Sequence, residues 1–322
     1  MTPRRGSVTT RPPRHDAKPL DARSAWTAVS DERDTPGSGQ RTARPTALAP
    51  GAVIGNRYEL VSILDRGGVG TIWSARDSVG ACDVALKVVA SGDARIDGRF
   101  RREVAIGREI AGAHFVPLRD FGAEPQFAWF VMELLRGEDL ATRLDRLGAL
   151  PRDVVVRVAR DLATALDAAH AAGLVHRDLK PKNIFMALDA SGQETLKVLD
   201  FGAAKQVFTA SKLTATGVLL GSPHYMSPEQ IESGSEVDHR TDLWSMAAIL
   251  YRALVGRRPF DGELATLLVR VRTEEAPPPS AIDSTLPGDV DGVFEQALAK
   301  DPCRRFRTAA ALAQAFATSL EA

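Results

Sequence analysis

The side chains best suited to chemistry gather in one stretch of the chain, His176-Arg177-Asp178-Leu179-Lys180-Pro181-Lys182-Asn183. Asp178 can accept a proton, Lys180 supplies a cation, and Asn183 supplies an amide that can bind a metal. Phosphoryl transfer uses this combination, because the protein positions a hydroxyl group and neutralises phosphate charge without forming covalent bonds itself. The stretch therefore predicts phosphoryl-transfer chemistry, although each of these residues taken alone would also suit a solvated basic turn.

Written as H-R-D-x-K-x-x-N, the same stretch resembles the catalytic loop of bacterial, Hanks-type serine/threonine protein kinases. The resemblance implies that Asp178 orients an acceptor Ser/Thr hydroxyl and takes its proton. It implies that Lys180 stabilises the transferring phosphoryl group of ATP and that Asn183 binds Mg²⁺ or Mn²⁺. His176 and Arg177 are then expected to support the loop, with Arg177 awaiting a phosphate.

A second metal ligand is implied where Asp200-Phe201-Gly202 follows a short apolar strand that starts at Leu196. This tripeptide resembles the D-F-G motif, whose aspartate holds Mg²⁺ against the phosphates. D-F-G alone is common by chance. Its position after the H-R-D stretch is what favours a metal-binding role for Asp200.

The segment between Asp200 and Glu229 is the expected activation loop, because its end, from Gly221, is similar to the family's G-T-P-x-Y-M-A-P-E. Ser222 keeps the hydroxyl that helps hold the catalytic residues in Ser/Thr-specific members. Thr214 and Thr216 match threonines that similar bacterial kinases autophosphorylate. Both remain open to the simpler interpretation of polar loop residues.

A glycine-rich hairpin is predicted ahead of these motifs. Alternation predicts a strand from Tyr58 to Leu64, a turn over residues 66–70, and a returning strand from Thr71 to Arg76. Glycines let backbone N–H groups approach phosphate oxygens closely. The resemblance to G-x-G-x-x-G-x-V implies that ATP contacts Leu64, Gly67, Gly68, Gly70 and Ile72.

Asp65 stands where that pattern has its first glycine. A carboxylate about 8 Å from a triphosphate costs on the order of 0.5–2 kcal/mol per unit charge. The hypothesis is that Asp65 weakens ATP binding without abolishing activity, because the other glycines remain.

Lys87 lies at the centre of the apolar strand Asp83 to Val89, where a charge needs an anionic partner. It resembles the lysine of V-A-I-K that holds the α- and β-phosphates, and Ala85 would then lie against adenine. Glu103, in a predicted helix, is the implied partner of Lys87. Gly107 follows one turn later and would loosen that helix, or simply accommodate local packing.

A buried strand from Phe127 leads into residues that resemble the connection between kinase lobes. The resemblance places Met132 behind adenine, has the backbone of Glu133 and Leu135 contact the base, and brings Asp139 to the ribose.

The rest of the chain predicts a large, mainly helical lobe, starting with a long helix from Pro151 to about Gly173. The segments around Asp242 and Arg305 resemble parts of the kinase large lobe, and the resemblance implies that Asp242 braces the catalytic loop and that Arg305 pairs with Glu229. The implied fold class is α+β, a two-lobe protein kinase fold with a small antiparallel β lobe and a large helical lobe.

Composition predicts the domain boundaries, the class of partner and the cellular compartment. Residues 1–52 are rich in Arg, Pro and Thr and are expected to be disordered, and 53–320 form the kinase domain, with lobes at about 57–135 and 136–320. Lys+Arg and Asp+Glu both number 41, which disfavours nucleic-acid binding. No apolar stretch suits a membrane segment, and the two cysteines have no disulfide or metal spacing, which favours the cytoplasm.

The sequence therefore predicts an ATP-dependent serine/threonine protein kinase that acts on protein substrates. This implies a possible homodimer in which one copy autophosphorylates the other. The regulatory signal is expected to enter by a route other than a fused membrane sensor. The competing hypothesis is a pseudokinase that senses nucleotide and acts as a scaffold, with Asp65 and Gly107 as its support. An adaptor role for the basic tail is compatible with catalysis.

Overall fold

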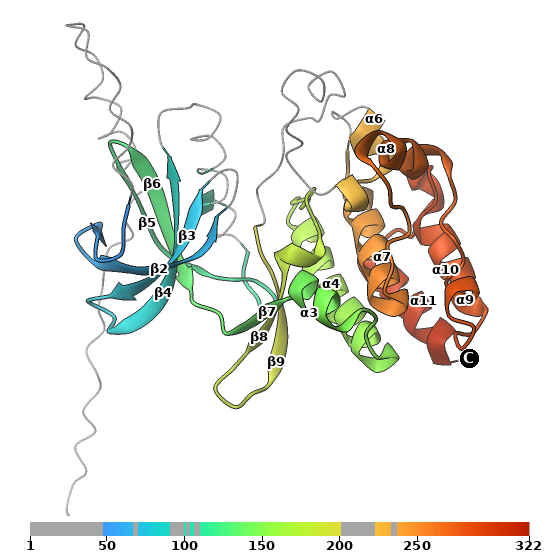
Figure 1. The fold of residues 1–322 in the computed structure, drawn as a ribbon, viewed down its shortest axis with the longest axis horizontal. Coiled ribbons are helices and arrows are strands. Elements are labelled where there is room, and N and C mark those ends of the chain that lie inside the picture. Colours follow the sequence, from blue (N-terminus) through green and yellow to red (C-terminus); the bar gives the residue numbers. More distant parts are fainter. Residues whose placement is uncertain are drawn as a thin grey trace, which may run out of the picture.

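The computed structural model describes residues 48–66, 70–90, 100, 104–105, 110–200, 223–232 and 237–321. Figure 1 shows two lobes, one built from strands and the other mainly from helices, with the chain passing from β6 to β7 between them. The predicted two-lobe fold class is therefore confirmed. None of the helices in the described ranges is long and apolar enough to cross a membrane.

The small lobe is a six-stranded antiparallel sheet in the order β1-β2-β3-β4-β6-β5. Its central strand, β4, has six consecutive buried residues, all apolar except Lys87. The strands are β1 (Val53–Ile54), β2 (Tyr58–Arg66), β3 (Thr71–Asp77), β4 (Cys82–Ala90), β5 (Leu118–Glu124) and β6 (Phe127–Glu133).

Two apolar clusters hold this sheet. One packs Tyr58, Trp73 and Trp129 on one face, and Leu48 and Ala52 lie against it, so the packed structure begins before residue 53. On the other, Phe100 packs against Phe130 with a ring-centroid distance of 5.8 Å. Phe100 and Val104 therefore pack on this face of the sheet.

A second, three-stranded sheet carries the catalytic stretch into the large lobe. Its order is β7-β8-β9, with β7 at Gly137–Asp139, β8 at Ile184–Leu188 and β9 at Glu194–Val198. Gly137 has φ 131°, and a Cβ there would lie 2.0 Å from the Met186 carbonyl oxygen. Only glycine therefore allows β7 to pair this closely with β8.

The large lobe is organised around helix α7 (Arg240–Val255), in which 13 of the residues are buried, including Trp244 and Tyr251. Helix α4 (Arg152–Ala171) packs against it and against α11. The remaining helices are α3 (Leu140–Leu147), α6 (Pro228–Glu232), α8 (Leu264–Thr273), α9 (Pro279–Ile282), α10 (Asp289–Ala297) and α11 (Ala309–Glu321), with short 3₁₀ turns at η2 (Pro181–Asn183), η3 (Pro223–Tyr225) and η4 (Pro302–Arg304).

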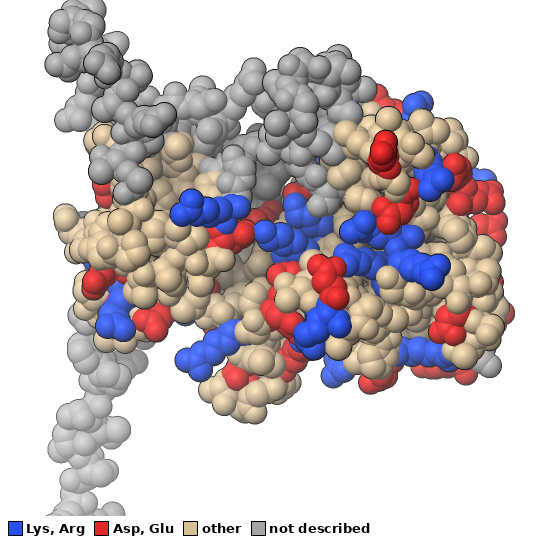
Figure 2. All heavy atoms as spheres, viewed as in Figure 1, with Lys and Arg blue, Asp and Glu red and all other residues tan. Residues whose placement is uncertain are grey.

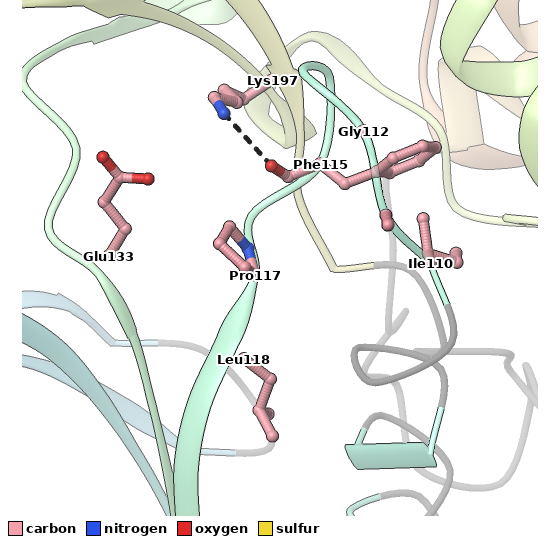
Figure 3. A pocket seen from close by; sticks show the side chains of 8 residues that line it. Ile110, Gly112, Phe115, Pro117, Leu118, Glu133 and Lys197 are labelled. Carbon is pink, nitrogen blue, oxygen red and sulfur yellow. Dashed lines mark hydrogen bonds between the residues drawn. The ribbon is translucent and has the colours of Figure 1, made fainter. Parts of the chain in front are cut away.

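The lobes are also joined behind the chain crossing, where the segment before β5 runs beside β9. Phe115 forms a parallel bridge with Val198, and Lys197 Nζ donates to the Phe115 carbonyl oxygen at 3.2 Å (Figure 3). A cavity of about 520 Å³ opens at this junction, with Pro117 on one wall and Glu133 on another. The segment thus connects the small-lobe sheet to the large lobe.

Candidate active site

A cavity of about 540 Å³ lies between the lobes. Figure 2 shows the surface hollowed between the lobes, with acidic and basic side chains along the edges of the hollow. Of the residues predicted to contact ATP or metal, the cavity is lined by Leu64, Ile72, Ala85, Glu133, Leu135, Asp139, Asn183 and Asp200. Met132 lines it as well. The structure therefore brings together residues from both lobes that sequence reasoning had assigned to one site.

The hairpin above the cavity fits tightly against β4. Ile72 lies opposite Lys87 in the sheet register, which aligns the apolar roof with the buried lysine. A Cβ on Gly70 would lie 2.3 Å from the Val88 carbonyl oxygen. Gly70 is thus required by close backbone packing, which is a structural reason for this glycine beside any role toward phosphate.

The catalytic stretch is anchored to α7 by the buried carboxylate of Asp242. Its Oδ2 accepts from the His176 backbone N–H at 2.8 Å, and its Oδ1 accepts from the Arg177 N–H at 2.9 Å. His170 Nε2 also contacts Oδ2 at 2.8 Å. Arg177 has φ 60°, a left-handed conformation that is costly for a side chain with a Cβ and persists where its surroundings hold it.

His176 is fully buried, and its two ring nitrogens have complementary partners. The Asp178 backbone N–H donates to Nδ1 at 3.2 Å, while Nε2 lies 3.0 Å from the Leu199 carbonyl oxygen. Since the first contact needs an acceptor and the second a donor, the ring is neutral with its proton on Nε2. His176 therefore links the catalytic loop to the residue that precedes Asp200.

Three functional groups meet around Asp178. Lys180 Nζ lies 2.9 Å from its Oδ2 carboxylate oxygen. Asn183 Nδ2 donates to the Asp178 backbone carbonyl at 2.9 Å, which leaves the Asn183 amide oxygen for another ligand. The stretch from Asp178 to Asn183 thus holds a proton acceptor, a cation and a metal-capable oxygen within six residues.

Lys87 meets Asp200 across the lobes, with Nζ 3.0 Å from Oδ1. The side chain of Lys87 is 10% exposed and that of Asp200 is 38% exposed. Burial would raise the pKa of Asp200, but the charge and hydrogen bond of Lys87 outweigh burial and hold this pKa below its usual range. Asp200 is therefore ionised near neutral pH. Its φ of 56° is a second left-handed residue at the site.

Asp65 also has a partner in the opposite lobe. Lys182 Nζ lies 3.0 Å from Asp65 Oδ1, and both residues line the cavity. The carboxylate that replaces the first glycine of the hairpin is thus compensated by a cation, whereas the sequence hypothesis had treated it as an isolated charge.

Arg305 and Glu229 form the pair that the sequence suggested. Both guanidinium NH₂ groups contact the carboxylate, at 2.7 and 2.8 Å, and the Arg305 side chain is fully buried. The Arg305 guanidinium group also lies 4.9 Å from the Trp244 ring centroid. This pair fixes the end of the 200–229 segment onto the core of the large lobe.

The family model described as "Protein kinase domain" matches residues 58–317. The chain belongs to the protein kinase family. Its kinase domain therefore includes both lobes and the cavity between them.

Bacterial proteins named as serine/threonine kinases are similar to this kinase domain. PknA of Corynebacterium glutamicum is 37% identical over 262 residues, covering 79% of this chain and 54% of the relative. PknE of Mycobacterium tuberculosis is 34% identical over 261 residues, covering 80% and 45%. The kinase pkn3 of Myxococcus xanthus is 35% identical over 282 residues, covering 84% and 51%. The chain spans about half the length of these relatives.

Several kinase positions predicted from the sequence lie outside the described residues. They are Gly67, Gly68, Glu103, Gly107, Thr214, Thr216 and Ser222. The predicted pairing of Lys87 with Glu103 and the two phosphorylation sites therefore stay predictions.

Sequence reasoning missed part of the cavity wall. Phe185 and Leu199 line the kinase cavity from the large lobe, and Val116 lines it as well. Phe185 follows Asn183 by two residues in β8, and Leu199 directly precedes Asp200. Their proximity to the metal-binding candidates was the available signal, because apolar residues flanking such positions form the sides of a nucleotide pocket.

Proposed function

We propose that the protein is an ATP-dependent serine/threonine protein kinase. The observation that supports it best is a set of contacts made by Asn183 and Asp200, which line the cavity, and by the residues next to them. Lys87 contacts Asp200, Asn183 contacts Asp178, and Asp178 contacts Lys180. Every reacting group that a pseudokinase would lack is present in this set. The serine/threonine specificity is supported by the relatives' names and by the hydroxyl of Ser222.

The proposed roles follow from charge and position. Asp178 is the carboxylate that accepts the proton of a Ser or Thr hydroxyl on a protein substrate, and Lys180 offsets negative charge on the transferring phosphoryl group. Lys87 holds the α- and β-phosphates of ATP. The apolar roof, Leu64, Ile72 and Ala85, and the backbone of Glu133 and Leu135 receive the base, with Asp139 toward the ribose.

Asn183 and Asp200 suit a hard divalent cation, Mg²⁺ or Mn²⁺. Both line the cavity, and each supplies oxygen, the ligand atom such ions prefer. Among the described residues no cluster of three or more His, Cys, Asp or Glu side chains could hold a metal alone. This fits Mg²⁺, which is commonly bound by one or two protein groups together with substrate phosphates. When bound, the ion neutralises charge on those phosphates.

The proposal extends to setting and partners. Cys82 and Cys303 are both free thiols, which is usual in a reducing compartment such as the cytoplasm. Equal numbers of acidic and basic residues support a protein substrate over nucleic acid. A homodimer would let one copy phosphorylate Thr214 or Thr216 of the other.

The test is to incubate the purified protein with ATP and Mg²⁺ and map phosphorylated residues by mass spectrometry. We expect phosphate on Thr214 or Thr216, and a rate about 10²–10⁴-fold lower in Asp178→Asn. Asp83→Asn, a 58% exposed carboxylate outside the cavity, is the matched control. ATP binding without phosphate transfer to the protein or to Ser/Thr peptides would contradict the proposal.

A further inference from the structure

The outer contact between the lobes is the ion pair of Asp65 and Lys182. Asp65 lies in β2 of the small lobe, and Lys182 lies in η2 of the catalytic stretch, 117 residues later. Their side chains are 41% and 57% exposed, whereas Lys87 in the inner pair is 10% exposed. Two ion pairs thus join the lobes, one through the nearly buried Lys87 and one through two exposed side chains that both line the cavity.

We propose that Asp65 and Lys182 form a clasp that holds the mouth of the cavity closed and slows the release of nucleotide. The inference rests on the proposed function, since it takes a nucleotide as the occupant of the cavity. Asp65 and Lys182 both line the cavity, one from each lobe. In this proposal a molecule leaves between β2 and η2, and the contact opens first.

The two charges also explain why Asp65 is tolerated at a glycine position. An unpaired carboxylate at the mouth would repel phosphate groups, but the ammonium group of Lys182 at 3.0 Å cancels most of its field. Lys182 has two further N–H donors for water or ligand. The pair therefore contributes a contact between lobes at little electrostatic cost to an anionic ligand.

The expected size of the effect follows from exposure. Ion pairs this accessible to water typically contribute about 0.2–1 kcal/mol, which corresponds to a change of about 1.4- to 5-fold in a rate or equilibrium constant. The contribution is screened by salt, because the Debye length falls from about 8 Å at physiological ionic strength to about 3 Å at 1 M. A clasp of this kind adjusts exchange without locking the site.

The test measures the release rate of a fluorescent ADP analogue by stopped flow. Asp65→Asn, Lys182→Gln and the double variant should each release it about 1.4- to 5-fold faster, with no further gain in the double variant. The charge exchange Asp65→Lys with Lys182→Asp should restore slow release. About 1 M salt should raise the release rate of the native protein toward the rates of the variants. Glu232→Gln with Arg272→Gln neutralises an equally exposed pair within the large lobe and should change nothing.

A field effect on the phosphates, without a clasp, predicts a different pattern. Asp65→Asn would then slow release while Lys182→Gln would speed it, and the two changes would add in the double variant. The charge exchange would not restore slow release. Either that pattern or unchanged rates would overturn the clasp.

Hydrogen exchange without nucleotide separates this inference from the proposed function. The clasp predicts equally faster amide exchange at the end of β2 in both single variants, whether or not the protein binds ADP. Unchanged exchange there contradicts the clasp. Failure to bind ADP with faster exchange contradicts the nucleotide site alone.

Discussion

Asp242 and Lys87 are both charged residues with less than a tenth of their surface exposed, but their partners lie in different places. Asp242 accepts hydrogen bonds from His170, His176 and Arg177, all within the large lobe. Lys87, in the small lobe, contacts Asp200, which follows β9 of the large lobe. The first arrangement survives any movement between lobes, whereas the second exists only when the lobes are placed to allow it. A substitution at Asp242 should therefore lower the stability of the protein, whereas a substitution at Lys87 should lower its activity with little effect on stability.

The largest expected effect comes from removing the Asp242 carboxylate. Asp242→Ala leaves a buried and a partly buried backbone N–H group and the partly buried His170 without their acceptor, and losing one side of such a network costs about 3–5 kcal/mol. We expect a melting temperature lower by roughly 6–20 °C, since each kcal/mol shifts a domain of this size by about 2–4 °C. Activity should be lost as well, because the catalytic loop loses its anchor. Thermal unfolding and peptide phosphorylation measure the two effects.

Asp242→Asn is the graded control for this prediction. The amide keeps the shape and one acceptor oxygen, so its loss of stability should lie between the native protein and Asp242→Ala. An Asp242→Ala protein with native melting temperature would show that the bonds to α7 do not hold the loop.

Lys87→Met should have the opposite balance. Loss of the ammonium group removes the cation beside Asp200, and we expect kcat/KM to fall by at least about 100-fold, or roughly 2.7 kcal/mol of transition-state stabilisation. Stability should change by less than about 1 kcal/mol, because methionine fills the same apolar space and the partly exposed Asp200 remains hydrated. Steady-state kinetics and urea unfolding give both values.

Lys197→Met is the matched control, since Lys197 also contacts a group from the neighbouring lobe but lies at the junction behind the chain crossing (Figure 3). It should keep its activity. A loss of several kcal/mol of stability in Lys87→Met would mean that the inter-lobe pair holds the fold together, and the comparison with Asp242 would fail.

The same contrast explains how far the sequence could be interpreted. The predicted helix from Pro151 to about Gly173 appears as α4 (Arg152–Ala171), and the predicted hairpin appears as β2 and β3, because their apolar periodicity is set by one buried face. Strand β5 (Leu118–Glu124) was not predicted, since nearly all of its residues are half-buried and their polarity does not alternate. Local patterns reveal elements with one clear buried face.

Contacts between distant segments could be predicted only where a family motif specifies them. The resemblance led to the residues of the cavity and to the pair of Arg305 and Glu229. It could not reveal that Asp65 meets Lys182, because neither motif pattern specifies these two side chains and they are 117 positions apart. The roles assigned to the cavity residues remain predictions that the kinetic variants test.

The smallest expected effect comes from Asp77, a small-lobe residue. It tests whether a charged residue whose partner lies in its own lobe affects stability alone. Asp77 is a buried carboxylate of the small lobe whose partners lie in that lobe, with Arg57 Nε and Nη2 both at 2.7 Å. Arg57 is 35% exposed, so the free energy of unfolding should fall by only about 1 kcal/mol in Asp77→Asn at neutral pH. Activity should be unchanged, as expected for a residue outside the cavity. Urea unfolding and peptide phosphorylation measure these values.

The stabilising effect of Asp77 should depend on pH. The hydrogen bond from Arg57 holds the pKa of Asp77 well below its usual range, against the effect of burial, and the backbone N–H groups of Val79 and Gly80 add to it. A carboxyl group with a lower pKa in the folded state stabilises the protein fully above its unfolded pKa of about 3.9. The difference between native protein and Asp77→Asn should therefore be constant from about pH 7 to 5 and shrink below about pH 4. Asp83→Asn, in the exposed pair with Arg76, should show neither effect. A difference that grows on acidification would show that Asp77 is not held as the charged partner of Arg57.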